Sequence, residues 1–195
     1  MFLLYAVVLG VLAGLLLGGR PAGLGTLRIR WSGLALAGLL FQVVLFTDAV
    51  AGRVGEWGPV LYVGSTLAVL AAILRNVSIP GMPLVAVGAL CNLAAILANG
   101  GYMPAGAAAL DALGKAEPVL YSNSTVVQDP ALWFLTDILA LPRWLPGANV
   151  FSFGDILIGL GIGVVIVLAM RRGRAGDEAS PAAGSADHAS GATAH

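Results

Sequence analysis

Charged residues are scarce in this 195-residue chain: only 10% of its residues are Asp, Glu, Lys or Arg. An ordinary soluble domain carries about 25%, and here 58% of the residues are hydrophobic. A chain this poor in charge exposes apolar side chains to lipid rather than to water, which argues against a soluble protein. The net charge is zero and the basic residues form no stripe, so no nucleic acid is expected as a partner.

Cysteine, lysine and histidine are almost absent as well. The lone Cys91 cannot form a disulfide within the chain, so the redox compartment is not readable from it. The two histidines, His188 and His195, lie in the final stretch, where a mobile tail cannot hold an imidazole ring in place. We expect no metal and no cofactor.

Five apolar runs are long enough, or nearly so, to cross a bilayer core that takes about 20 helical residues. They cover residues 2–18, 31–50, 59–74, 83–98 and 153–170. The first run has no basic residue ahead of it, unlike a signal peptide, so we expect a retained helix. The predicted fold class is an all-α integral membrane bundle of about five transmembrane helices, formed by residues 1–172.

Arginine is distributed unevenly between the two ends of this predicted bundle. One end receives Arg20, Arg28, Arg30, Arg75, Arg171, Arg172 and Arg174. The other receives Arg53, Lys115 and Arg143. Because basic residues favour the cytoplasmic side, we predict a bacterial inner-membrane protein with its N-terminus outside and its C-terminus in the cytoplasm. Residues 173–195 are expected to be a disordered cytoplasmic tail.

The segment 99–150 then lies outside and is too apolar for a simple loop. Asp129 followed by Pro130 is typical of a helix start. We therefore predict a short interfacial helix over 131–141, with Trp133 and Trp144 at headgroup depth, and a second short helix near 105–113.

Small and polar residues mark the faces on which the predicted helices pack. Gly10, Gly14 and Gly18 share one helical face, which suits either a neighbouring helix of the same chain or a homodimer. Gln42 and Asn92 lie inside apolar runs, where an unpaired amide is costly. We expect Gln42 to link two helices, whereas Asn92 is either such a link or part of a site.

Two carboxylates, Asp137 and Asp155, are the candidate chemical groups. They are 18 residues apart, and the prolines between them allow a turn that brings both to one outer cavity. Paired carboxyl groups can share a proton and activate a water molecule. Ser152 and Asp155 also have the spacing of a capping box, so a purely structural role for Asp155 is equally open.

The membrane part as a whole resembles a bacterial family of small multi-pass proteins of unknown function. The resemblance rests on Asn99-Gly-Gly-Tyr-Met-Pro104, Leu135-Thr-Asp-Ile-Leu139 and Phe151-Ser-Phe-Gly-Asp-Ile-Leu-Ile158. It implies no established activity.

The start of the last run also resembles lipoprotein signal peptidase, signal peptidase II. Phe151, Asp155, Ile158 and Gly161 match that family's last-helix motif F-N-x-A-D-x-x-I-x-x-G, and Gly88-Ala-Leu-Cys-Asn92 matches its upstream asparagine motif. The resemblance implies an aspartic peptidase with Asp137 and Asp155 as catalytic residues. Its supporting residues would be Asn92, Asn99 and Ser152. Ala95 and Ile96 replace an Asp-Arg pair of the family.

Three functions follow from these observations. We predict first a multi-pass membrane protein that binds lipid or partner helices at its outer face. The alternatives are an aspartic peptidase or hydrolase acting on a membrane-embedded peptide or lipid, and a small transporter component. No acidic residue is predicted in the middle of a span, which argues against ion-coupled transport.

Overall fold

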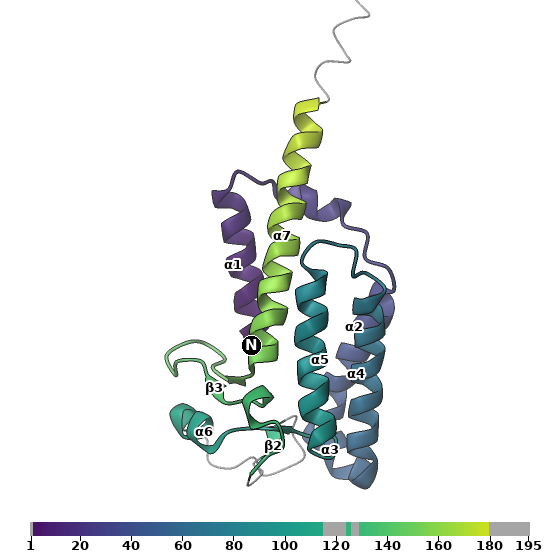
Figure 1. The fold of residues 1–195 in the computed structure, drawn as a ribbon, viewed down its shortest axis with the longest axis vertical. Coiled ribbons are helices and arrows are strands. Elements are labelled where there is room, and N and C mark those ends of the chain that lie inside the picture. Colours follow the sequence, from purple (N-terminus) through teal and green to yellow (C-terminus); the bar gives the residue numbers. More distant parts are fainter. Residues whose placement is uncertain (1, 115–123, 126–128, 180–195) are drawn as a thin grey trace, which may run out of the picture.

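The computed structural model describes residues 2–114, 124–125 and 129–179 (Figure 1). The positions of Lys115 and of residues 180–195, with the two histidines, lie outside these described residues.

Helices make up most of the described chain, as predicted, but the fold is not purely α-helical. The α-helices are α1 (Phe2–Leu16), α2 (Ser32–Leu45), α3 (Asp48–Val54), α4 (Gly58–Leu74), α5 (Met82–Ala98), α6 (Ala107–Leu113) and α7 (Phe153–Ala179). The 3-10 helices are η1 (Pro21–Thr26), η2 (Gly55–Trp57) and η3 (Trp133–Leu135). Two small sheets pair β1 (Met103–Pro104) in parallel with β2 (Ser124–Thr125), and β3 (Leu139–Ala140) antiparallel with β4 (Val150–Phe151).

The five long helices stand side by side in the order α1, α7, α5, α4, α2 (Figure 1). Neighbours in this row are antiparallel except α1 and α7, which run in the same direction. Since α1 and α2 stand at opposite edges of the row, the chain between them crosses α7 near Met170 through η1. The backbone N–H of Arg20 donates to the carbonyl of Met170 at 2.9 Å, which fixes this crossing.

The outer faces of the long helices are apolar. Leu9 and Leu16 of α1 are 63% and 87% exposed, and Val43 of α2 is 67% exposed. Two helical stretches, Ala49–Leu74 and Phe153–Arg172, are long and apolar enough to cross a membrane, and α1, α2 and α5 are shorter apolar helices. A soluble monomer rarely exposes so much contiguous apolar surface, and the fold is consistent with a helical membrane protein.

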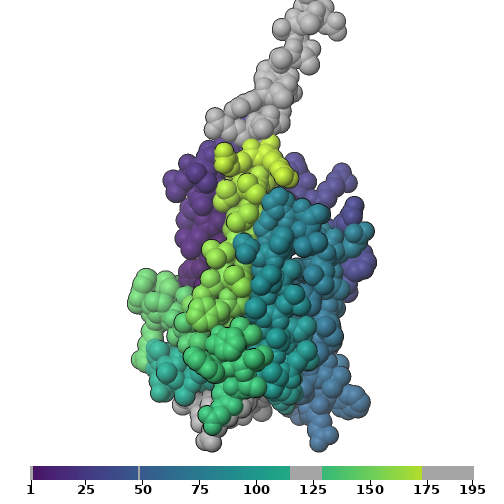
Figure 2. All heavy atoms as spheres, in the orientation of Figure 1, coloured from purple at the N-terminus to yellow at the C-terminus, as the bar shows by residue number. Residues whose placement is uncertain are grey.

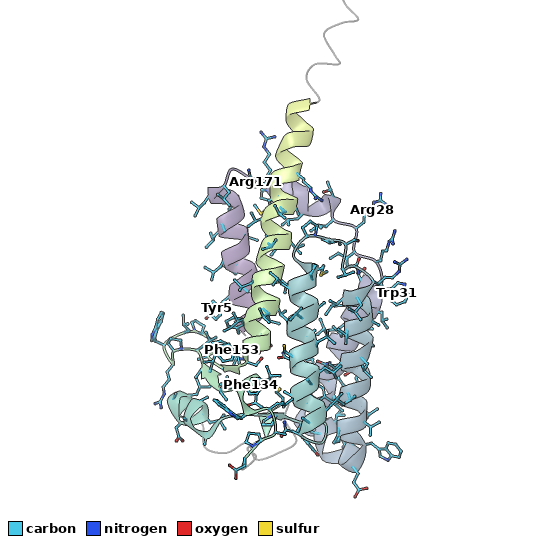
Figure 3. The ribbon with its side chains drawn as sticks, in the orientation of Figure 1. Tyr5, Arg28, Trp31, Phe134, Phe153 and Arg171 are labelled. Atoms are coloured by element: carbon cyan, nitrogen blue, oxygen red, sulfur yellow. The ribbon has the colours of Figure 1, made fainter. Side chains whose placement is uncertain are left out.

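The arginines gather at two opposite ends of the bundle. Arg28 and Arg171 lie at the end where α7 leaves the row (Figure 3). Arg30 joins them there, because its backbone N–H and C=O both bond the side-chain amide of Asn76 in the α4–α5 turn. The predicted grouping of these residues at one end is thus seen, while the side of the membrane they face stays a prediction.

Two predicted helix boundaries need correction. The run predicted over 31–50 is broken, because α2 ends at Leu45 and the backbone of Thr47 is extended, with φ −73° and ψ 144°. The hydroxyl of Thr47 donates to the carbonyl of Val44, which closes the turn. At the other end of the chain, α7 continues to Ala179, so residues 173–179 of the predicted tail are helical.

The interfacial helix predicted over 131–141 does not form. Asp129 and Leu132 both have φ +53°, a left-handed conformation that an α-helix cannot contain. Beyond η3 the backbone bonds distant strands instead, as the N–H of Asp137 donates to the carbonyl of Pro104 and that of Leu141 to Asn149. The short helix expected near 105–113 is present as α6.

Glycines bring α5 and α7 into backbone contact. A Cβ atom on Gly88 would stand 2.4 Å from the carbonyl oxygen of Gly154, and one on Gly161 would stand 2.6 Å from that of Gly81. Real Cβ atoms do not approach other atoms so closely, so neither position admits a side chain without separating the helices. The two pairs lie seven residues, about two helical turns, apart on each helix.

Replacing Gly88 by Ala should therefore destabilise the bundle. The added methyl group meets backbone, which cannot move aside like a side chain, and overpacking of this kind costs about 1–3 kcal/mol. Thermal unfolding of the purified protein in detergent measures the loss. Gly64→Ala in α4 is the matched control, because a Cβ there meets nothing within 4 Å. Equal melting temperatures for the two variants would contradict this account of the contact.

Candidate functional site

A closed set of hydrogen bonds joins α5 to the start of α7. The amide of Asn92 donates to Oδ1 of Asp155 at 2.8 Å, and the hydroxyl of Ser152 donates to Oδ1 of Asn92 at 2.8 Å. The N–H of Ser152 donates to Oδ2 of Asp155 at 3.1 Å. We call Asn92, Ser152 and Asp155 the polar clasp.

The local sequence accounts for the bonds between Ser152 and Asp155. Ser152 immediately precedes α7, and its hydroxyl oxygen accepts the N–H of Asp155 at 3.0 Å while the Asp155 carboxylate accepts the N–H of Ser152. This reciprocal pair is the capping box that the spacing predicts, with Asp in place of Glu. Asn92 of α5 adds the link to a second helix, and Ser152 is fully buried.

Asp155 points into the bundle, toward α5. The sequence places it on one face with Gly159 and Gly163. In the structure Asp155 faces α5, whereas a Cβ on Gly159 would contact Ala6 and Phe2 of α1. The start of α7 is therefore held between two helices.

Asp137 lies in the segment between η3 and β3 and is 7% exposed. Its backbone N–H donates to the carbonyl of Pro104, and its backbone carbonyl accepts the N–H of Gly106. These two hydrogen bonds join the Asp137 segment to the chain after α5. The adjoining strand β3 pairs with β4, whose last residue, Phe151, directly precedes Ser152. The hairpin thus folds the Asp137 segment back over the start of α7, and η3 contacts α7 as well, with Phe134 and Phe153 shown in Figure 3.

Asn99, the remaining predicted supporting residue, shapes the outer segment. Its amide donates to the carbonyl of Ala131, and its side-chain oxygen accepts the N–H of the same residue, both at 2.9 Å. This pairing holds the backbone where the sequence predicts a helix. Asn99 is a partner of Ala131 here and not a member of the clasp.

Two further polar side chains link separate parts of the chain. Gln42 of α2 donates to the hydroxyls of Ser65 and Thr66 of α4, so its expected role as an interhelical link is confirmed. Sequence reasoning missed Asn76, which is buried and bonds both backbone groups of Arg30. Its position just after an apolar run, next to Arg75, gave no periodic signal.

An apolar groove runs along the contact of α1 with α7. The glycine face of α1 packs on the same chain, because a Cβ on Gly10 would meet Gly163 at 3.1 Å and one on Gly14 would meet Met170 at 2.5 Å. Homodimerisation through Gly10, Gly14 and Gly18 stays a prediction. Beside this contact runs a cavity of about 680 Å³. Its lining comprises Phe2, Tyr5, Ala6, Leu9, Gly10, Ala13, Leu141, Leu145, Ile156, Gly159, Leu160, Gly163, Val164, Val167 and Leu168.

The fold and the clasp define a helical bundle with an apolar exterior. A model described as a family of unknown function (DUF5317) matches residues 26–167, and the chain belongs to that family. This confirms the predicted membership of a family without an assigned activity, and the match begins after α1. Among curated proteins and solved structures none matches the chain, and nothing in the comparisons supports the likeness to signal peptidase II.

The clasp predicts energetic coupling between α5 and α7. Asn92→Ala leaves a carboxylate oxygen of Asp155 without its amide donor, which costs about 1–3 kcal/mol. In a double-mutant cycle with Asp155→Ala, the two changes should be non-additive by about 0.5–3 kcal/mol in the free energy of unfolding. Asn92→Ala combined with Gln42→Ala, on a separate helix pair, is the control and should be additive. Additivity in both cycles would show that the clasp carries no coupling.

Proposed function

We propose that this protein is an integral membrane protein that holds a lipid acyl chain in the groove between α1 and α7. The observation that carries the proposal is the groove itself, whose volume lies within the range of about 300–1,000 Å³ of small-molecule sites. Apart from the Tyr5 hydroxyl, its lining side chains are hydrocarbon or aromatic, or are absent at glycine.

The direction and length of the groove support an acyl chain as the occupant. Its lining on α7 runs from Ile156 to Leu168, about 18 Å along the helix axis. One leaflet of a bilayer contributes about half of a hydrocarbon core roughly 30 Å thick. An extended chain lying parallel to the helices therefore matches the groove in length as well as in polarity.

One end of the groove is covered, and this favours an acyl chain over a partner helix as the occupant. Leu141 and Leu145, from the β3–β4 hairpin, line the groove beside Phe2 and Tyr5. The hydroxyl of Tyr5 donates to the carbonyl of Pro146 at 2.7 Å and ties the hairpin to α1. A transmembrane helix seated there would run into the hairpin, whereas an acyl chain can end below it. Figure 2 shows the hairpin region against the start of α1.

Gly163→Phe tests the proposal. A Cβ at Gly163 meets nothing within 4 Å although the residue lines the groove, so the added ring enters the groove without an initial clash. The protein is reconstituted in vesicles that contain a phospholipid with a photoreactive acyl chain, and cross-linked peptides are identified by mass spectrometry. Labelling of α1 and α7 should fall at least about tenfold, since excluding two methylene groups at about 0.8 kcal/mol each suffices for that.

Gly64→Phe is the matched control, because Gly64 is also a helical glycine with open space at its Cβ but lies on α4, away from the groove. It should leave labelling of α1 and α7 unchanged. Undiminished labelling in Gly163→Phe would overturn the proposal. So would cross-linking of the groove to a second protein helix in place of lipid.

The hydrolase alternative rests on a different observation. The β3–β4 pairing brings the Asp137 segment against the start of α7, where Asp155 and Asn92 already meet. We propose this reaction, on a membrane-embedded peptide or ester, as the second candidate. The N-out, C-in orientation would place the reaction at the outer membrane face. The transporter interpretation stays a prediction without further support.

Asp137→Asn separates the hydrolase from the binding protein. The change removes the carboxyl group but keeps the side chain's size, so acyl-chain labelling of the groove should persist. If the protein is a hydrolase, peptide and lipid profiles of a deletion strain should differ from wild type and stay uncorrected by this variant. Full correction of the profiles by Asp137→Asn would eliminate the hydrolase alternative.

A further inference from the structure

A second cavity, of about 330 Å³, opens at the arginine-rich end of the bundle. Three separate parts of the chain form it: the end of η1, the α4–α5 turn and the last buried turn of α7. Its lining comprises Thr26, Leu27, Arg28, Ser78, Ile79, Pro80, Ala169 and Arg172. This cavity is distinct in its lining from the groove between α1 and α7.

The charged groups of the cavity are both positive. Arg28 and Arg172, both exposed, line it from elements far apart in the sequence, and none of the described residues in its lining is acidic. Within the described part of the chain, neither guanidinium group makes a hydrogen bond or an ion pair that would neutralise it. Two arginines beside one cavity favour an anion, and the planar fork of arginine suits the paired oxygens of a phosphate.

Hydroxyl groups and apolar side chains complete the lining. Thr26 and Ser78 are the hydroxyl-bearing residues of the lining, and the Thr26 hydroxyl donates to the carbonyl of Gly23. The other lining residues, Leu27, Ile79, Pro80 and Ala169, are apolar. A cavity that is polar on one part and apolar on another fits an amphiphile better than a free ion.

The position of the cavity in the bundle agrees with this chemistry. It lies where the apolar stretch of α7 gives way to Arg171 and Arg172, the level at which a membrane helix meets the headgroup layer. Basic pockets between helices at that level bind the phosphate of anionic lipids. The hydrogen bonds of Asn76 to Arg30 keep the crossing segment beside the α4–α5 turn, so both walls are held.

We propose that this cavity binds the phosphate of an anionic phospholipid headgroup, with Arg28 and Arg172 as the phosphate-binding residues. Thr26 and Ser78 lie within the same lining and bond the glycerol or phosphate oxygens. The site shares no lining residue with the acyl-chain groove, and each can be tested without the other.

The test uses the full-length protein in detergent, titrated with phosphatidylglycerol and observed by native mass spectrometry. Arg28→Gln combined with Arg172→Gln should weaken binding of phosphatidylglycerol at least about tenfold, because a hydrogen bond to a charged group contributes that much or more. The control combines Arg75→Gln with Arg171→Gln, two exposed arginines of the same end that do not line the cavity. It removes the same charge and should change binding less than about twofold.

Two further arms identify the source of the phosphate. Phosphatidylcholine with the same acyl chains, which carries no net charge, should bind more weakly than phosphatidylglycerol. Inorganic phosphate at millimolar concentration should fail to displace the lipid. Equal losses in the two double variants, no loss in either, or displacement of the lipid by inorganic phosphate would each overturn the proposal. Melting temperatures near that of the wild type exclude unfolding as the cause of a loss.

Discussion

At the contact of α5 with α7, two pairs of glycines let the helix backbones touch, and the rest of the bundle is arranged around that approach. Gly81 meets Gly161 and Gly88 meets Gly154, so the helices run antiparallel in a fixed register. Continuing that register toward the start of α7 brings Asn92 to Ser152 and Asp155. The close approach thus determines which side chains form the polar clasp, and the clasp in turn fixes where α7 begins.

This central position leaves α7 with separate faces for separate neighbours. One face lies on α5, another receives α1 at Gly159, and Met170 supports the crossing segment by accepting the backbone N–H of Arg20. Van der Waals packing and hydrogen bonds hold helices together where lipid surrounds them, because the hydrophobic effect no longer favours helix association. In such an environment α7 is held by close packing at the small residues on two of its faces and by the hydrogen bond from the amide of Asn92 in α5.

The predictability of each part depended on how local its causes are. The bounds of α4 and α5 follow within a residue from apolar runs that begin near Pro59 and Pro83. The capping box at Ser152 and Asp155 is also local, so its spacing predicts it. The segment 131–141 was predicted wrongly, because the partners of its backbone are Asn99 and the strands β1 and β4, which sequence spacing does not reveal.

Neither cavity was predictable, since each depends on the order of the helices. An apolar α1 can stand beside any neighbour, and only its place next to α7 creates the groove. The arginine cavity similarly requires the chain from α1 to α2 to cross α7 near Met170. Hydropathy shows that Arg28 and Arg172 belong to one end but not that they line one cavity.

The two proposed lipid contacts lie on different sides of the same turn of α7. Leu168 lines the groove and Ala169 lines the cavity, and successive helical residues point about 100° apart. Met170 follows them, fully buried against Gly14 of α1 and Gly19 of the chain leaving α1. A displacement of α1 would therefore change the groove through Gly10 and the crossing segment through Met170 at once. Occupancy of one site can therefore affect the other only if α1 moves. The element that would couple the two sites is thus α1, which lies outside the family match.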